Sequence, residues 1–267
     1  MIKPGEIQKK ATQSGVRDTQ IEKDYVLSWL LKGISQQSNL SKAILFKGGT
    51  VLKKVYFEDY RFSEDLDFTL MNSEVTNEEI FTWFEEVFII IRDEANIPLE
   101  IIDNNEHDDG GINFYISYRG PLGGQGSNKK VKVDISRNEL LVFQPVTKDV
   151  LINYSDLEAH QLLCYPLEEV LVEKMRCVMQ RMEARDFYDL WYLLEEHQMA
   201  MEDYPVEFEA KCKSKGLSAV NFSKLLAQRL PQYKARWKGS LSEQIKDLPD
   251  FDQVEREMMR QVKKLKF

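Results

Sequence analysis

The chain has little of what several common enzyme classes require. Its 267 residues include only three cysteines and three histidines, and neither type is clustered. Cys164, Cys177 and Cys212 show no Cys-x-x-Cys spacing, and their odd number gives no disulfide framework, so we expect them to be reduced. The scattered histidines leave zinc sites and Ser-His-Asp triads without their usual partners. Any metal ion should therefore be a hard cation held by carboxylates.

Long hydrophobic runs are also missing. Apolar runs such as Val87 to Ile91 are far too short to cross a bilayer, and residues 1–4 do not open an apolar signal segment. We therefore expect a cytoplasmic protein with no membrane partner.

The formal net charge of −8 argues against a protein that coats nucleic acid non-specifically. Residues 211–240 nevertheless carry eight Lys or Arg residues and no acid. This basic tract also contains Phe222, Tyr233 and Trp237, so two interpretations fit it: a helical surface with buried aromatics, which we favour, or a surface that contacts RNA.

Hydrophobic residues make up 43% of the chain and follow two patterns. Helical spacing predicts helices over about 19–33, with Thr19 and Glu22 as a capping box, and over 75–94. Strands are predicted at 43–46, 65–70, 99–102, 112–118 and 130–136, with a glycine-rich loop at 119–130. From Pro166 onward the pattern is helical, so we divide the chain into a mixed domain, 1–150, and a mainly helical domain, 151–267.

The segment KGGTVLKKVYFEDYRFSEDLDF, residues 47–68, carries the strongest chemical signal. Asp65 and Asp67 stand two apart on a predicted strand, so their carboxylates share one face and can share divalent cations. Asp134, on a later predicted strand, is the best candidate for a third carboxylate. Phosphoryl or nucleotidyl transfer needs such a set, because bound Mg²⁺ stabilises charge in an in-line displacement.

Gly48 and Gly49 precede a helix predicted to begin near Thr50. Free N–H groups at a helix start, without side chains in the way, let a phosphate approach closely. A Gly-Gly pair or an Asp-x-Asp pair alone is usually only a turn or a solvated strand. Their joint order along this chain is far more restrictive, and it predicts a turn that binds a triphosphate next to carboxylates that bind its metal.

A third group of charges lies in the helical half. On one continuous predicted helix, Lys174, Arg181 and Arg185 fall at i, i+7 and i+11 and form a narrow stripe that could neutralise a triphosphate. The alternative is that they pair with neighbouring acids on a solvated helix.

These segments resemble a known family. The segment 47–68 is similar to the signature motif of the DNA polymerase β-like nucleotidyltransferases, and specifically of their AbiEii branch, the toxin component of type IV AbiE toxin–antitoxin systems, to which the mycobacterial Men-type toxins are related. TQIEKDYVLSWLL, KVDI and EEVLVEKMRCVMQRMEARDFYDLWYLL also resemble that branch. The similarity spans roughly residues 18 to 196.

The resemblance implies an α+β (mixed α/β) fold, in which a nucleotidyltransferase core with a mixed sheet is followed by a helical C-terminal domain that closes the active-site cleft. It implies a transferase that uses Mg²⁺ (or Mn²⁺) and moves a nucleotidyl group from an NTP onto RNA, such as tRNA. It further implies a toxin in a toxin–antitoxin or phage-defence (abortive infection) system, with a separately encoded antitoxin. A catalytically inactive nucleotide- or RNA-binding module of the same fold is the alternative, and a purely structural interaction protein is a weaker one.

The resemblance also assigns residues. It implies catalytic roles for Asp65, Asp67, Asp134, Lys174 and Asp186, of which the first three are metal ligands. Asp189 is the alternative to Asp186 as the required aspartate of that segment. The nucleotide-binding set comprises Lys47, Gly48, Gly49, Thr50, Ser63, Lys132, Arg181, Arg185 and Asp189.

The order of the glycines and carboxylates generates a first prediction. Asp67→Ala should abolish nucleotidyl transfer and leave the fold intact, because a lost metal ligand removes several kcal/mol of transition-state stabilisation. Transfer of label from an NTP to RNA measures the effect, and circular dichroism checks the fold. Full activity in a well-folded variant would contradict the metal assignment.

Overall fold

The chain forms two compact units in the computed structural model, which describes residues 1–108, 110–124 and 129–265. The first unit comprises Met1–Glu139 and Pro145–Tyr165, and the second comprises Leu140–Gln144 and the chain from Pro166 onward. The first unit thus extends past residue 150, at which the sequence pattern divides the chain. Of the expected loop at 119–130, residues 125–128 lie outside the described residues.

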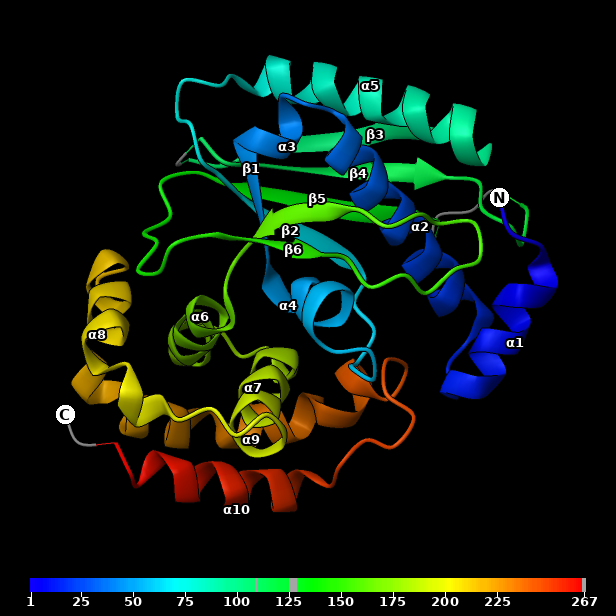
Figure 1. Ribbon diagram of the computed structural model, residues 1–267. Helices are drawn as coiled ribbons and strands as arrows, with labels where there is room; N and C mark the ends of the chain where they lie inside the picture. Colours follow the sequence, from blue (N-terminus) through cyan, green and yellow to red (C-terminus); the bar gives the residue numbers. More distant parts are fainter. Residues whose placement is uncertain (109, 125–128, 266–267) are drawn as a thin grey trace. The chain divides into compact units, whose positions relative to one another are not determined.

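Within the described residues, a seven-stranded mixed sheet forms the first unit, in the order β3-β4-β5-β2-β1-β7-β6 (Figure 1). Its strands are β1 (Ile44–Lys47), β2 (Asp65–Leu70), β3 (Leu99–Glu106), β4 (Ile112–Tyr118), β5 (Lys130–Ser136), β6 (Val146–Asp149) and β7 (Gln161–Cys164). β2 is antiparallel to β1 and parallel to β5, and β1 is parallel to β7. The predicted α+β fold with a mixed sheet followed by helices is confirmed.

The sequence pattern missed β6 and β7. Each has only four residues, which is too short for an alternating pattern to be recognised. Both become strands through pairing, since β6 is antiparallel to β7 and β7 lies beside β1.

The helices of the first unit are α1 (Pro4–Ser14), α2 (Asp18–Gln36), α3 (Leu40–Ala43), α4 (Gly48–Val51), which continues as a π-helical turn (Leu52–Tyr56), and α5 (Asn77–Ala95). The expected capping box of Thr19 and Glu22 is wrong, because α2 starts earlier, with Arg17 at the N-cap and no side-chain capping bond. A capping box is present instead on α5, between Thr76 and Glu79.

Alternation along the strands divides the sheet into an apolar and a polar face. Leu66 of β2 and Val133 of β5 are fully buried on the apolar face. Phe114 of β4 packs edge-to-face on Phe84 of α5, with ring centroids 5.0 Å apart. α5 in turn packs against α2, so hydrophobic burial holds these helices on the apolar side and leaves the other face of β2 and β5 polar.

A buried ion pair ties α2 to the turn after α4. The Lys54 ammonium is fully buried, 2.7 Å from the Asp24 carboxylate. Tyr154 donates a 2.7 Å hydrogen bond to the same carboxylate. Burial lowers the pKa of Lys54, and the adjacent Asp24 opposes that shift. These contacts join three distant segments of the chain around one charge pair.

The second unit is helical, as predicted. It contains α6 (Leu167–Gln180), α7 (Ala184–Trp191), which continues as a π-helical turn (Tyr192–Glu196), α8 (Pro205–Ser214), α9 (Phe222–Leu241) and α10 (Phe251–Val262). Phe222, Tyr233 and Trp237 of the basic tract are buried, and Tyr233 stacks on Phe187 with centroids 4.9 Å apart. The favoured interpretation, a helical surface with buried aromatics, is confirmed.

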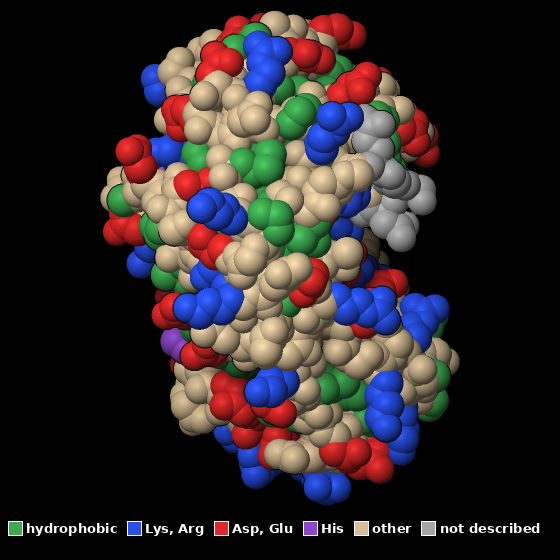
Figure 2. All heavy atoms as spheres, turned by 90° about the vertical axis from the view of Figure 1, so that its right-hand side faces the viewer, with side chains coloured by type: hydrophobic (Ala, Val, Ile, Leu, Met, Phe, Trp, Pro, Cys, Tyr) green, Lys and Arg blue, Asp and Glu red, His purple; other side chains and the backbone are tan. Residues whose placement is uncertain are grey.

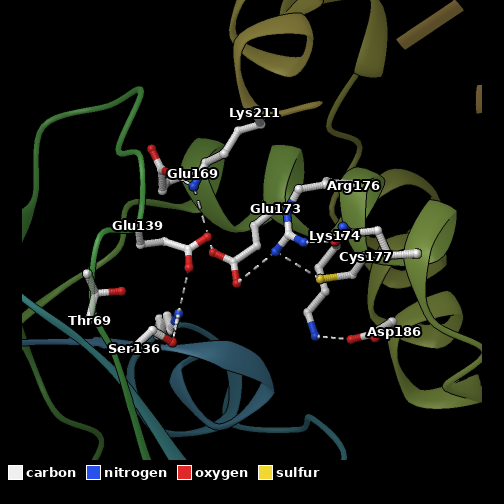
Figure 3. Close-up of polar contacts among 12 residues, drawn as sticks. Thr69, Ser136, Glu139, Glu169, Glu173, Lys174, Arg176, Cys177, Asp186 and Lys211 are labelled. Carbon is white, nitrogen blue, oxygen red and sulfur yellow. Dashed lines mark hydrogen bonds and ion pairs between the residues drawn. The ribbon is translucent and has the colours of Figure 1, made fainter. Parts of the chain in front are cut away.

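A second buried charge pair attaches residues 140–144 to this unit. Glu169 accepts hydrogen bonds from the backbone N–H groups of Val142 and Phe143, and the fully buried Lys211 ammonium lies 2.5 Å from the same side chain. Figure 3 shows Glu169 and Lys211 facing each other. Lys211, the first cation of the basic tract, is therefore buried in an ion pair within the unit.

The surface does not gather charge of one sign on the face drawn in Figure 2, where acidic and basic side chains are interspersed. In the described part of the chain, no helix combines the length and apolar character needed to cross a membrane.

Candidate functional site

The polar face of β2 and β5 brings the predicted carboxylates together. In the parallel register, Asp65 pairs with Lys132 and Asp67 pairs with Asp134. Paired residues of adjacent strands project to the same face of a sheet. Asp67 and Asp134 are therefore neighbours, and both are partly exposed to solvent.

Gly48 lies against the Asp67 carboxylate. Its φ of +80° is unfavourable for any residue with a side chain. A Cβ built on it would be 2.3 Å from Asp67 Oδ2 and 2.9 Å from Asp67 Cγ. Two features thus require glycine at this position: the left-handed backbone, and the close approach of that backbone to a carboxylate. The helical run Gly48–Tyr56 begins at this point, two residues before Thr50, near which it was predicted to begin.

Thr50 and Ser63 hold the start of β2. The Thr50 hydroxyl is buried and donates a 2.5 Å hydrogen bond to the backbone oxygen of Asp65, while its Oγ1 lies 2.7 Å from Ser63 Oγ. Both hydroxyls are engaged within the protein. Their effect is to fix the backbone that carries Asp65.

Lys47 brings a buried cation to the same neighbourhood. It pairs with Asp67 in the antiparallel register of β1 and β2. Its ammonium donates to Ser136 Oγ at 3.0 Å and lies 3.7 Å from Glu139, whose side chain is equally buried. Figure 3 shows Ser136 and Glu139 close to one another. The lysine is therefore held by two partners that the sequence analysis did not single out.

Asp134 has two cationic or polar neighbours of its own. Its carboxylate lies 3.2 Å from the Lys132 ammonium and 3.8 Å from His107 Nε2. His107 Nε2 also lies 3.0 Å from the side-chain nitrogen of Asn113. His107, Asp108, Asp134 and Ser136 line an open hollow of about 500 Å³. The scattered histidines gave no reason to single out His107 beforehand, because only the pairing of β3, β4 and β5 brings it near Asp134.

The donor chemistry of this face fits a hard divalent cation. Asp65 and Asp67 share the face, Asp134 adjoins Asp67, and Gly48 leaves room at the Asp67 oxygens. Among the described residues, however, no three Asp, Glu, His or Cys side chains gather closely enough to hold a metal ion. The set of three carboxylate ligands remains a prediction.

Lys174 lies in a buried charge cluster of the helical unit. Its ammonium is 2.7 Å from both the Asp186 and the Asp189 carboxylate (Figure 3 shows the first contact). Arg181 binds Asp186 with two hydrogen bonds, of 2.6 and 3.1 Å. Burial acts against charge on Lys174, yet both carboxylates outweigh it and raise the pKa of the ammonium. Likewise, burial favours neutral Asp186, but Lys174 and Arg181 hold the pKa of this carboxyl below its usual value.

The predicted stripe of Lys174, Arg181 and Arg185 on one helix is wrong. α6 ends at Gln180, Arg181 is extended (φ −121°, ψ 155°), and Arg185 belongs to α7. The helix ends there although no glycine or proline follows, so the sequence carries no signal for its end. The alternative of exposed ion pairs is also wrong for Lys174, whose partners are buried.

The contact of Gly48 with Asp67 makes a testable prediction. Gly48→Ala should displace the Asp67 carboxylate and reduce transfer on the order of 10²-fold, besides costing roughly 1–2 kcal/mol for the left-handed backbone. Gly216→Ala is the matched control, because Gly216 also has a positive φ (+69°) but nothing within 4 Å of an added Cβ. Both variants should lose stability through the left-handed backbone, but only Gly48→Ala should lose activity. Equal activity in the two variants would contradict a role for this contact.

The Lys174 cluster makes another prediction, on stability. Lys174→Met leaves two buried carboxylates without their main cation and should lower the free energy of unfolding by about 3–5 kcal/mol. Lys213→Met is the control, since the bridge from Lys213 to Glu209 is exposed and worth less than about 0.5 kcal/mol. Urea unfolding of both variants measures the difference. Similar midpoints would show that the cluster is not a stabilising unit.

Comparison with known proteins identifies the family of this chain. The solved structures that share the fold include MenT4, a nucleotidyltransferase toxin from Mycobacterium tuberculosis (16% identity, TM-score 0.55, 97% of this chain and 99% of that chain covered). They also include, from Helicobacter pylori, a putative nucleotidyltransferase (17%, 0.55, 88% and 90%) and JHP933 (18%, 0.54, 88% and 88%). A search of curated proteins found no match. The family model described as nucleotidyl transferase AbiEii toxin, type IV TA system, matches residues 29–257. The chain therefore belongs to the AbiEii family of nucleotidyltransferase toxins of type IV toxin–antitoxin systems.

Proposed function

We propose that this nucleotidyltransferase toxin transfers a nucleotidyl group from an NTP to an RNA acceptor, such as a tRNA, with the carboxylates of Asp65, Asp67 and Asp134 as its metal ligands. Membership of the family already implies an NTP substrate and an antitoxin partner. The observation that carries the finer proposal is the row of Asp67 and Asp134 in register on adjacent strands, with the Gly48 backbone against Asp67.

The reaction is an in-line displacement at the α-phosphorus of the NTP. A hydroxyl oxygen of the acceptor forms the new bond to phosphorus, the bond to the β-phosphate bridging oxygen breaks, and pyrophosphate leaves with the electron pair while the hydroxyl proton passes to solvent. Mg²⁺ (or Mn²⁺), when bound to the three aspartates, would stabilise the charge that accumulates on these oxygens.

The chain's own residues have distinct proposed tasks. Gly48, Gly49 and the N–H groups at the start of α4 receive phosphate oxygens, and the Lys47 ammonium adds positive charge beside them. Thr50 and Ser63 act indirectly, because their hydroxyls hold the backbone at Asp65. Such prior fixation limits the reorganisation needed when the charged substrate binds.

Lys174 is proposed to contact the nucleotide, as the family resemblance implies. Its ammonium is held by Asp186 and Asp189, which supports a positioning role for both aspartates rather than a choice between them. Arg181 adds a second cation to this group. Lys132, beside Asp65 and Asp134, can neutralise phosphate oxygens on the sheet face.

The direct test is to incubate the purified protein with each α-³²P-labelled NTP, Mg²⁺ and total cellular RNA, and to separate RNA and protein afterwards. Labelled RNA that requires an intact Asp67 is expected. Labelled protein without labelled RNA would show that the acceptor is a protein and not RNA. Nucleotide binding without any transfer would favour the inactive binding module.

The third carboxylate makes a further prediction. Asp134→Asn should lower turnover on the order of 10²-fold while changing nucleotide affinity less, because Asp65 and Asp67 are proposed to hold the metal of the triphosphate. Asp149→Asn, on β6 of the same sheet and hydrogen-bonded to Gln161, is the control and should keep full turnover. Steady-state kinetics with separate NTP binding measurements decide the point, and unchanged turnover in Asp134→Asn removes this residue from the site.

A further inference from the structure

The polar face of the sheet continues beyond the carboxylates onto β4. In the antiparallel register of β4 and β5, Tyr115 pairs with Lys132 and Asn113 pairs with Asp134. Tyr115, Lys132 and Asp65 thus form one row across three adjacent strands, with all three side chains on the same face. An aromatic ring therefore lies in the same row as Asp65, one of the predicted metal ligands.

Tyr115 is set apart from the hydrophobic core. Its neighbours Phe114 and Ile116 are fully buried on the apolar face, whereas Tyr115 is partly exposed. The ammonium of the exposed Lys130 lies over its ring, 4.2 Å from the centroid. A cation on an aromatic face orients the ring and adds positive charge beside it.

Positive charge extends from this ring to the end of β4. Arg119 is exposed there, and Ser117, Arg119 and Lys129 help to line a hollow of about 400 Å³. Lys129 is already paired with the buried Glu22, and Lys132 with Asp134. Glu100 and Asp103 of β3 are the acids paired across from Ser117 and Tyr115. Arg119 and Lys130 are therefore the exposed cations of this strip.

The strand order places Tyr115 on one side of the carboxylates and the turn at Gly48 and Gly49 on the other. Along the sheet the order is β4, β5, β2, β1. Gly48 follows β1, Tyr115 lies on β4, and Asp67 and Asp134 occupy the two strands between them. In an in-line displacement the incoming and leaving oxygens are on opposite sides of the phosphorus, so a nucleotide at the β1 side calls for an acceptor at the β4 side.

We propose that Tyr115, with Lys130 and Arg119, binds a single-stranded end of the RNA acceptor, with one base stacked on the Tyr115 ring and the neighbouring phosphates at the two cations. The inference rests on the proposed function, because it names where that acceptor binds. Stacking on an aromatic ring combined with cations along the backbone is how proteins bind single strands, and a base inside a duplex has no face to offer.

Binding can be tested without catalysis. The probe is a short fluorescein-labelled single-stranded RNA of mixed sequence, and its fluorescence anisotropy is measured with wild-type protein in the absence of NTP and Mg²⁺. Tyr115→Ala should weaken binding about tenfold, and Tyr115→Phe should retain it because the ring remains. Lys130→Ala should flatten the salt dependence of log K by about 0.7.

The sheet offers a matched control for the lysine. Lys148 of β6 also lies over a tyrosine ring, that of Tyr56, at 6.0 Å from the centroid. Lys148→Ala should leave affinity and salt dependence unchanged. Thermal unfolding verifies that each variant is folded, and Tyr115→Phe and the exposed Lys130→Ala keep the test valid if Tyr115→Ala fails to fold.

Three results would overturn the proposal. The first is an affinity of Tyr115→Ala or Lys130→Ala for the single-stranded RNA equal to that of wild type. The second is an equal affinity of wild type for the single strand and for a duplex of the same sequence. The third is that Tyr115→Ala raises only the KM for the NTP. The last outcome would make Tyr115 part of the nucleotide site. None of the three contradicts the proposed transfer to RNA, whereas failure of the proposed function would appear as absent label transfer with RNA binding unchanged.

Discussion

The parallel pairing of β2 with β5 is the constraint on which the candidate site depends. It sets Asp67 beside Asp134 and Asp65 beside Lys132, although some seventy residues separate the two strands in the sequence. A shift of one residue would send Asp134 to the apolar face and bring Val133 to the polar one. That shift is opposed by the buried side chains on the apolar face, which are Leu66, Phe68, Val131, Val133 and Ile135. Hydrophobic burial on one face therefore fixes the positions of the carboxylates on the other.

Around this register, several polar groups hold others in place. The Thr50 hydroxyl fixes the Asp65 backbone, and Ser136 and Glu139 hold the Lys47 ammonium. Burying such groups costs free energy unless each is hydrogen-bonded, and here the partners supply that compensation. Gly48 contributes by what it lacks, because any side chain would occupy the space of the Asp67 oxygens. Fixed dipoles and charges of this kind lower the reorganisation that accompanies binding of a charged ligand.

The sequence predicts the parts of this arrangement that local patterns encode. β2, β4 and β5 have the predicted bounds, since alternation over six or seven residues is unambiguous. The four-residue strands β6 and β7, the end of α6 at Gln180 and the position of His107 beside Asp134 could not be predicted. Each of these depends on contacts between segments far apart in the chain, and no spacing rule within one segment carries that information. The roles of the site residues remain predictions.

The residues that resemble the family motifs occur in two different physical settings. Asp65, Asp67 and Asp134 lie partly exposed on a sheet face, where carboxylates keep much of their hydration and can exchange it for a cation. Lys174, Asp186 and Asp189 are buried and compensate one another's charge, so removing any one leaves an uncompensated charge in a medium of low dielectric constant. Loss of activity on substitution is therefore equally expected in both groups, but for different reasons. On the sheet it would report on substrate and metal, whereas in the helical unit it would first report on whether the three charges still hold one another in place.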